Sequence, residues 1–298
     1  MSKGKIILAG GSGFVGMYLN EKFTKTGYQV VNISRGKNGV NWNDEKGIKE
    51  ALENAHLVIN LAGKSVNCRY NAKNKTEILS SRVDTTKAIG NAILNCNTAP
   101  EIWFNASTAT IYRHAEDKPM TESEGEIGTG FSVEVAKSWE KAFFDFKLQN
   151  TRQVALRMAI VLGQNGGVIK PFKNLVRFGL GGNQGNGNQM FSWIHIEDLY
   201  RIIVFLIENK HIQGAVNCSS PFPVTNKALM MSFREVMKMS FGLPAPDFLL
   251  EIGARIIKTE TELILKSRWV IPEKLLEYGF NFSFPKIQDA LKSILNHS

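Results

Sequence analysis

The chain has 298 residues, of which 43% are hydrophobic and 21% charged, and its formal net charge is +9. This composition is ordinary for a globular protein, and the longest aliphatic and aromatic run, at 202–207, is too short to cross a bilayer. The basic start leads into an apolar run that ends at Gly10, which argues against a signal peptide. The three cysteines are widely spaced and form no disulfide or metal pattern. We therefore expect a cytoplasmic protein without a metal or a membrane partner.

Positive charge is spread along the chain, with one concentration between residues 69 and 87. Five basic residues in this segment are accompanied by only two acidic ones, Glu77 and Asp84. The segment lacks the interleaved aromatic side chains of a nucleic-acid platform. A solvated surface is the simpler interpretation of the scattered charge, and attraction of a small phosphorylated ligand is the alternative. We expect no nucleic-acid partner.

Buried strands and amphipathic helices alternate through the first half of the chain. The hydrophobic pattern predicts strands at 5–10, 28–34, 56–63, 101–107 and 152–163. It predicts helices between them at 14–26, 45–55, 75–95 and 131–149. Regular alternation of this kind is typical of a Rossmann-type α/β fold, a doubly wound parallel sheet covered on both faces.

The pattern changes after Gly163. Residues 178–189 are rich in glycine and amide side chains, which predicts a loop beside a ligand, and the chain from Val224 is mostly helical in pattern. We expect a dinucleotide-binding domain over 1–165, with later strands returning to it near 190–220. A smaller, mostly helical substrate lobe would occupy 166–298.

Three glycines, Gly10, Gly13 and Gly16, lie between the first strand and the first helix. The first permits a tight turn, the second lets a pyrophosphate approach the backbone, and the third lets the helix pack on the strand. Backbone N–H groups at the helix start, at Phe14 and Val15, would then hold the anion. The arrangement predicts a dinucleotide site.

The end of the second strand indicates which dinucleotide is bound. An NAD site places a carboxylate there, whereas this chain has Ser34 and Arg35, followed by Lys37. A guanidinium suits a 2′-phosphate, so the sequence favours NADP(H), although a surface arginine after a strand gives the same pattern.

Four stretches, "GGSGFVG", "VINLAG", "STATIY" and "WIHIEDL", resemble motifs of the extended short-chain dehydrogenase/reductases, the superfamily of nucleotide-sugar epimerases and dehydratases. Others, among them "EILSSRVDTT" and "VIPEKLLEYGF", resemble an epimerase-like family of unknown substrate sometimes labelled a cell-division inhibitor. The resemblance covers nearly the whole chain. It implies that Leu61, Ala62 and Gly63 flank the adenine of the cofactor, and superfamily members often form homodimers.

The resemblance also implies a catalytic Ser or Thr, a Tyr and a Lys. The motif match assigns the hydroxyl role to Thr108, with Ser107 beside it, and the lysine role to Lys137. The tyrosine position then holds Val133, which cannot exchange a proton.

Three nearby residues offer a substitute for the missing tyrosine: Tyr112, His114 and Glu134. A packed aromatic residue and a solvated helix residue are the simpler interpretations of Tyr112 and Glu134. Two roles stay open for Lys137: it takes part in proton transfer, or it only contacts a ribose hydroxyl of the cofactor.

Substrate residues are harder to assign. Phe191 and Ser192 stand where nucleotide-sugar enzymes often carry an arginine for the nucleotide phosphate. Gln189 in the amide-rich loop and His195 on the next strand are candidate substrate-binding residues, and a structural histidine is the alternative for His195. Asp198 is expected to cap a helix.

Two functions remain open. One is an NADP-dependent epimerase or oxidoreductase acting on a small polar, sugar-like or phosphorylated, metabolite. The other is a dinucleotide-binding sensor or regulatory protein that has lost turnover. Val133 and Phe191 favour the sensor, whereas Thr108, Lys137 and the amide-rich loop favour the enzyme.

Overall fold

The computed structural model describes residues 3–36, 39–245 and 266–296 and is built on a seven-stranded sheet. Every neighbouring pair in this sheet is parallel, in the order β10-β6-β5-β4-β1-β2-β3. This confirms the predicted Rossmann-type sheet. Its strands are β1 (Lys5–Ala9), β2 (Gln29–Ser34), β3 (Val40–Asn41), β4 (Leu57–Asn60), β5 (Ile102–Thr108), β6 (Arg152–Met158) and β10 (Gly214–Cys218).

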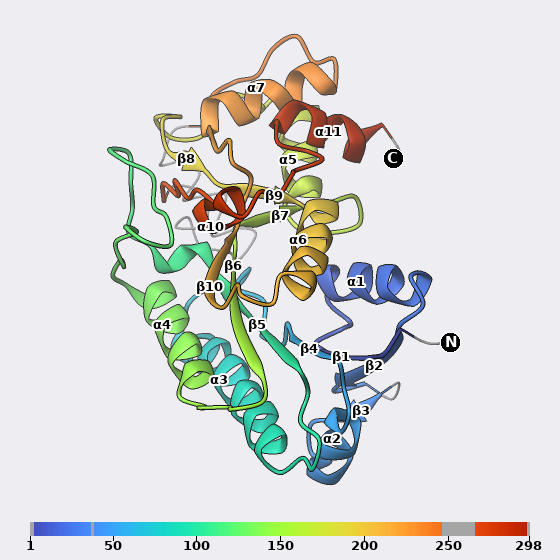
Figure 1. Cartoon of the computed structure of the whole chain (residues 1–298). Coiled ribbons are helices and arrows are strands. Elements are labelled where there is room, and N and C mark those ends of the chain that lie inside the picture. Colours follow the sequence, from blue (N-terminus) through green and yellow to red (C-terminus); the bar gives the residue numbers. More distant parts are fainter. Residues whose placement is uncertain (1–2, 37–38, 246–265, 297–298) are drawn as a thin grey trace.

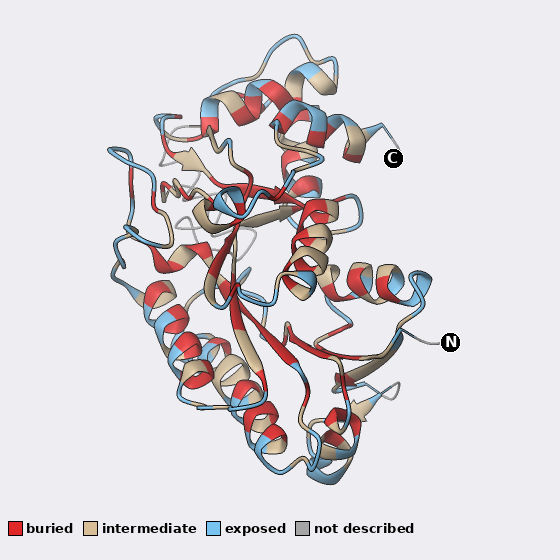
Figure 2. Ribbon diagram, in the orientation of Figure 1, coloured by how far each residue is buried: buried red, intermediate tan, exposed pale blue. Residues whose placement is uncertain are grey.

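Helices cover both faces of the sheet (Figure 1). One face carries α2 (Glu45–Leu52), α3 (Ala72–Leu94) and α4 (Phe131–Phe144), and the other carries α1 (Phe14–Lys25) and α6 (Ile196–Glu208). Successive residues of a strand point to opposite faces, so in β1 Ile6 and Leu8 join one core and Ile7 and Ala9 the other. The strands β1, β4 and β5 are accordingly buried along most of their length, whereas β2 and β3 at one edge are mostly half-buried (Figure 2).

A smaller lobe lies beyond the carboxyl ends of the strands, at the top of Figure 1. It has its own core, in which Phe172, Trp193, Phe233 and Leu291 meet. Two short sheets belong to it, one pairing β7 (Ile160–Leu162) with β9 (Trp193–His195) and one pairing β8 (Met190–Phe191) with β11 (Val224–Thr225). Its helices are α5 (Ile169–Arg177), α7 (Asn226–Val236) and α11 (Ile287–Leu295). The short helix α10 (Glu273–Glu277) packs instead on β10, and its Leu275 joins the core of the central sheet.

Several predicted elements end earlier than expected, and packing explains two of these differences. The helix predicted to reach 149 stops at Phe144, because the ring of Phe146 turns back against Trp103 and the bare backbone of Gly90. The strand predicted over 152–163 breaks after Met158, and Ile160 bonds to Ser192 of the lobe instead of to the central sheet.

Candidate cofactor and substrate site

Two of the three glycines are required by backbone packing. Gly10 has a φ of +80°, and a Cβ there would lie 2.8 Å from the backbone nitrogen of Ala62. A Cβ at Gly16 would lie 2.6 Å from the carbonyl oxygen of Gly10. The glycine loop therefore packs between the start of α1 and the segment after β4. Neither Gly10 nor Gly16 has room for a side chain in this arrangement.

The third glycine borders open space. Gly13 precedes α1 in an extended conformation, with φ −77° and ψ 168°, and a Cβ there would meet only the oxygen of Gly10, at 3.5 Å. No side chain caps α1, and its first turn holds no acidic residue. The N–H groups of a first turn, here including those of Phe14 and Val15, have no acceptor within the helix. An anion such as a pyrophosphate therefore fits at this helix end.

The segment expected to flank the adenine lies beside the glycine loop. Leu61 donates its N–H to the oxygen of Ala9 at 2.8 Å, which fixes the segment to the end of β1. Ala62 donates to Oδ1 of Asn60 at 3.1 Å, and Asn60 is buried and bonded to Asn105. Gly63 follows directly, and a Cβ there would touch the guanidinium of Arg82.

The predicted 2′-phosphate residues lie at the end of β2, the strand next to β1. Arg35 is exposed, and Ser34 accepts a hydrogen bond from Gly36 at its hydroxyl, at 3.2 Å. Lys37 lies outside the described residues. No carboxylate occurs between 33 and 36, so the residues at this strand end fit a phosphate rather than a bare ribose.

Thr108 ends β5 and begins the short 3₁₀ helix Ala109–Ile111. Its hydroxyl oxygen accepts the N–H of Thr110 at 3.1 Å, which leaves the hydroxyl proton free for donation. Ser107 is buried and donates to Oε1 of Glu140 at 2.6 Å. Of the two neighbouring hydroxyls, only that of Thr108 is partly accessible.

The helix that carries the lysine differs from the superfamily arrangement. Val133 occupies the tyrosine position and is fully buried. Lys137 is exposed, and its ammonium pairs with Glu134 at 3.0 Å. The motif lysine and Glu134, one of the three substitutes for the tyrosine, therefore pair with each other at the surface.

Tyr112 lies in the interior of the protein, where it does not fit the proton relay considered from the sequence. Its hydroxyl donates to Oδ1 of Asn217 at 2.9 Å and accepts from Arg157 at 2.8 Å, and the side chain is 1% exposed. Burial raises the pKa of Tyr112 although the charge of Arg157 opposes the rise. His114 is also engaged, because its Nδ1 accepts the N–H of Ser267 at 3.1 Å.

His195 is engaged by the fold through both ring nitrogens. Its Nδ1 accepts the N–H of Glu197 at 3.1 Å and so caps α6, and its Nε2 lies 3.1 Å from the hydroxyl of Ser293. The ring packs on Phe284, and burial lowers the pKa of the imidazole. This arrangement leaves His195 no free nitrogen for a substrate. Asp198 accepts the N–H groups of Ser283 and Phe284, each at 2.8 Å.

Gln189, the other predicted substrate residue, lines a small cavity of about 30 Å³ in the lobe. The lining comes from β7, β8, the start of α7 and the segment before Trp269, and consists of Ile160, Gln189, Met190, Phe191, Ser192, Asn226, Lys266 and Arg268. The sequence analysis did not single out Lys266 and Arg268. The sequence signal that could have pointed to them is the pair of basic residues around Ser267, just before the apolar run that begins at Trp269.

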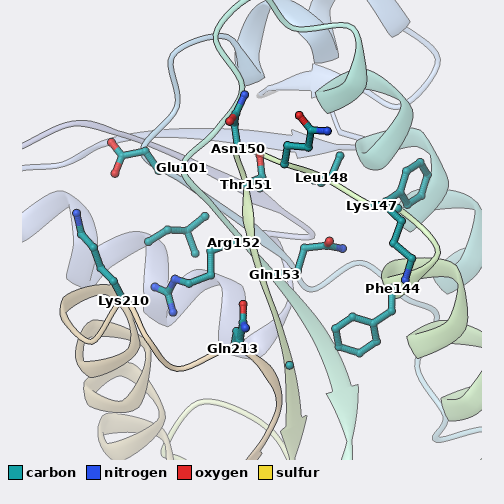
Figure 3. Close-up of a pocket in the computed structure, with 14 residues that line it drawn as sticks. Glu101, Phe144, Lys147, Leu148, Asn150, Thr151, Arg152, Gln153, Lys210 and Gln213 are labelled. Atoms are coloured by element: carbon teal, nitrogen blue, oxygen red, sulfur yellow. The ribbon is translucent and has the colours of Figure 1, made fainter.

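A larger hollow of about 730 Å³ lies at the opposite end of the sheet (Figure 3). Glu101, Arg152 and Gly214, at the amino ends of three neighbouring strands, line it. The Arg152 guanidinium donates to the oxygens of Ile212 and Leu206 at 2.6 and 2.5 Å, so it stabilises the turn after α6. Ligands of open α/β sheets bind at the carboxyl ends of the strands, which separates this hollow from the glycine loop.

Two searches of the described residues gave negative results. None of the helices in 3–36, 39–245 and 266–296 is both long enough and apolar enough to span a bilayer. Within the same ranges, no group of three or more His, Cys, Asp or Glu side chains has an arrangement that would hold a metal ion.

Comparison with known proteins gives matches along most of the chain. A model described as "NAD dependent epimerase/dehydratase family" matches residues 6–219, and one described as a domain of unknown function (DUF1731) matches residues 245–294. The epimerase family protein YfhF of Bacillus subtilis is 32% identical over 302 residues, covering 97% of each chain.

Two solved structures are similar over the whole chain. The crystal structure of human epimerase family protein SDR39U1 with NADPH has a TM-score of 0.89 and 28% identity, covering 99% of this chain and 100% of that one. A nucleoside-diphosphate sugar epimerase from Corynebacterium glutamicum has a TM-score of 0.81 and 25% identity, covering 100% of this chain and 59% of that one.

Proposed function

Because this chain belongs to the NAD-dependent epimerase/dehydratase family, we propose that it binds NADP(H) and acts on a small polar metabolite as an epimerase or oxidoreductase. The observation that carries the proposal is the open space at Gly13, in front of an uncapped helix and beside a strand end that bears Arg35. A relative of 28% identity was crystallised with NADPH, which supports the choice of dinucleotide.

The candidate cofactor-binding residues have the following roles in this proposal. The main chain at Gly13, Phe14 and Val15 holds the pyrophosphate, and Arg35 with Ser34 binds the 2′-phosphate. The residues after β4, Leu61 to Gly63, flank the adenine. A dinucleotide held by these residues would supply hydride-transfer chemistry.

The chain's own groups orient the substrate. The hydroxyl of Thr108 retains a proton that it can donate to a substrate oxygen, and Lys137 binds a ribose hydroxyl once it exchanges its contact with Glu134. With valine at 133 and Tyr112 buried, the proton that accompanies the hydride passes through Thr108 or through a group of the substrate.

The test of the cofactor assignment is Arg35→Glu. Loss of a charge-assisted hydrogen bond of about 1.5–3 kcal/mol predicts roughly a 10- to 100-fold weaker affinity for NADPH, with that for NADH nearly unchanged. Calorimetric titration with both dinucleotides measures the difference. Arg177→Glu, at an exposed arginine on α5, is the matched control. Equal losses for NADPH and NADH in the Arg35 variant would refute the role.

The second candidate function is a dinucleotide sensor without turnover. The burial of Val133 and the ion pair of Lys137 with Glu134 favour it, because they leave no tyrosine-based proton donor on α4. An absorbance assay separates the two candidate functions. The protein loaded with NADP(H) is mixed with sugars and polyols, and the nicotinamide absorbance is followed. Turnover that Thr108→Val abolishes at unchanged cofactor affinity supports the enzyme, and turnover that survives this change removes Thr108 from the mechanism.

Location and assembly are further parts of the proposal. We propose a cytoplasmic protein, in keeping with its three free cysteines, Cys68, Cys96 and Cys218. We also propose a homodimer formed through α3 and α4, which sedimentation analysis with and without NADPH would test.

A further inference from the structure

One of the five basic residues between 69 and 87 lies inside the fold. Arg82, on α3, is half-buried, whereas the other four basic residues of this segment are exposed. Its guanidinium lies behind Gly63, because a Cβ at Gly63 would come within 3.1 Å of Cζ and 3.2 Å of Nη1 of Arg82. Arg82 therefore contacts the segment that is proposed to flank the adenine, although it belongs to a different element.

Side chains of α3 hold the end of this segment through one residue, Lys64. The N–H of Lys64 donates to Oγ of Ser81 at 2.8 Å, and the carbonyl oxygen of Lys64 accepts from Nη1 of Arg82 at 3.0 Å. The same Nη1 donates to the oxygen of Ile78 at 2.9 Å, which ties the guanidinium to its own helix. Both polar groups of the Lys64 main chain are thus fixed by α3, directly after the adenine segment.

The start of the segment is fixed by the buried amide of Asn60. Its Oδ1 accepts the N–H of Ala62 at 3.1 Å, and its Nδ2 donates to Asn105 and Thr86 at 2.7 and 3.2 Å. Thr86 lies on α3, one turn after Arg82. The main chain of 61–64 is therefore held at both ends by the protein alone, and such preorganisation lowers the cost of binding a ligand.

The ring of Trp139 on α4 supports the guanidinium from the other side. Cζ of Arg82 lies 5.0 Å from the centroid of this ring, an arrangement in which the cation is attracted by the indole face. Nε1 of Trp139 donates to Oγ1 of Thr86 at 3.1 Å, which fixes the plane of the ring. Contacts with the main chain of 63–64 and with Trp139 therefore confine the guanidinium of Arg82.

No acidic side chain balances the charge of Arg82 within the described part of the chain. Its hydrogen bonds go to two backbone oxygens, and Glu77 on the same helix pairs with Lys64 instead. Burial lowers the pKa of Arg82 to about 10, although Tyr70 opposes this change, so the group is still cationic at neutral pH. A partly buried cation without an acid favours an anion nearby.

The glycine loop brings such an anion to this side of the sheet. A Cβ at Gly10 would lie 2.8 Å from the nitrogen of Ala62, and Gly63, the next residue, is in contact with Arg82. The glycine loop, the segment after β4 and Arg82 therefore form three successive layers. A dinucleotide on the first two layers carries its phosphates on the side where the charge of Arg82 acts.

We propose that Arg82 is a positioning residue of the cofactor site, which fixes the main chain beside the adenine and adds a positive charge behind the bound dinucleotide. The inference rests on the proposed function. It assigns one basic residue of the 69–87 segment to a phosphorylated ligand, while the four exposed residues keep the simpler interpretation of a solvated surface.

The test compares two arginines with similar contacts at opposite ends of the sheet. Arg82→Met should weaken NADPH binding about tenfold, measured by calorimetry or nicotinamide fluorescence on the full-length protein. Arg152→Met is the matched control: Arg152 also donates to two backbone oxygens and lies over an aromatic ring, and burial also lowers its pKa, but it lines the hollow of Figure 3. Its loss should reduce stability and leave the affinity for NADPH unchanged.

A fragment and two further variants assign the effect to the adenine segment. Adenosine 2′,5′-bisphosphate, the adenine half of the cofactor, should lose the same factor as NADPH in Arg82→Met. Arg82→Lys keeps the charge and should restore part of the affinity. Gly63→Ala should weaken NADPH several-fold, because its Cβ displaces the guanidinium, and should cause no further loss when combined with Arg82→Met.

The outcomes distinguish this inference from the proposed function. Circular dichroism and urea unfolding verify that each variant is folded and measure its loss of stability. A natural chain that binds neither NADPH nor adenosine 2′,5′-bisphosphate overturns the proposed function, and the cofactor role of Arg82 with it. If the natural chain binds NADPH, the inference alone is overturned by unchanged affinity in Arg82→Met, by equal losses in Arg82→Met and Arg152→Met, or by unchanged binding of the bisphosphate.

Discussion

At the residue scale, the glycine loop contains glycines with two different physical roles. Gly10 and Gly16 have no side chain because backbone atoms lie within 3 Å of where a Cβ would stand. Gly13 has room for a Cβ on the protein side and an ordinary negative φ. The described fold therefore does not require a glycine at this position, whereas the proposed pyrophosphate would.

This difference predicts opposite results for two valine substitutions. Gly13→Val should leave the melting temperature within a few degrees but weaken NADPH binding about 100-fold, because the side chain occupies the pyrophosphate space. Gly16→Val should lower the melting temperature strongly, since its side chain meets the backbone of Gly10 and Gly11. Thermal melts and fluorescence titration measure both. Unchanged affinity in Gly13→Val would contradict the pyrophosphate assignment.

At this scale, sequence reasoning reached only residues whose neighbours in the fold are also close in the chain. The glycine spacing and the strand-end Arg35 are contained in short stretches, and the structure places them at one end of the sheet. It could not find the partners of Tyr112 or His195, because Asn217 and Ser293 lie 105 and 98 residues further along the chain. Such partners depend on tertiary packing, which periodicity does not encode.

At the element scale, α6 begins with a histidine cap that is sensitive to pH. Burial lowers the pKa of His195, and the carboxylates of Asp198 and Glu197 offset only part of this effect. The folded-state pKa then lies below the unfolded value of about 6.5, so the unfolded chain binds more protons between the two. Stability should therefore rise with pH through this window and fall on acidification below about pH 6.5.

The cap predicts a pH-dependent difference between variants. His195→Asn keeps a capping side chain that does not titrate, so its free energy of unfolding should change less between pH 7 and pH 5 than that of the natural chain. His211→Asn, at an exposed histidine, is the control and should retain the full dependence. Urea unfolding at several pH values measures the slopes. Parallel slopes for all three proteins would rule out the cap as the source.

Element boundaries show the limit of the hydrophobic pattern. It predicted the four helices and most strands of the first half, because these elements bury a regular stripe or both faces. It missed β3, which has two residues, and the break after Met158, where the strand changes partner from β10 to β9. The pattern stays apolar across this break, since both partners bury it.

At the scale of the whole molecule, one buried polar chain joins the central sheet to the lobe. Arg157 on β6 donates to both oxygens of Glu140 on α4, each at 2.8 Å, and to Tyr112. Burial by itself would lower the pKa of Arg157, but its hydrogen bonds to Glu140 raise it instead. Tyr112 continues the chain to Asn217 on β10, which donates to the oxygen of Ile271.

Removing the charge at the centre of this chain should be costly. Arg157→Met leaves Glu140 buried without its partner, which predicts a loss of about 3–5 kcal/mol in the free energy of unfolding. Arg113 makes equally short contacts with Asp117 and Glu126, but at the surface, so Arg113→Met should change stability little. Denaturant titration measures both. Comparable losses in the two variants would show that burial is not the deciding factor.

Strand β10 returns to the central sheet after the first elements of the lobe. The change in sequence pattern near residue 165 therefore does not mark the point at which the sheet is complete. A chain cut after residue 165 would retain the glycine loop and six strands of the central sheet, but β6 would expose a row of backbone N–H and C=O groups that β10 normally satisfies. During synthesis on the ribosome that row stays open until residue 218 has emerged, and other chains can pair with it meanwhile. Part of the lobe, including α5, β8 and β9, thus has to be made before the sheet that precedes it is complete.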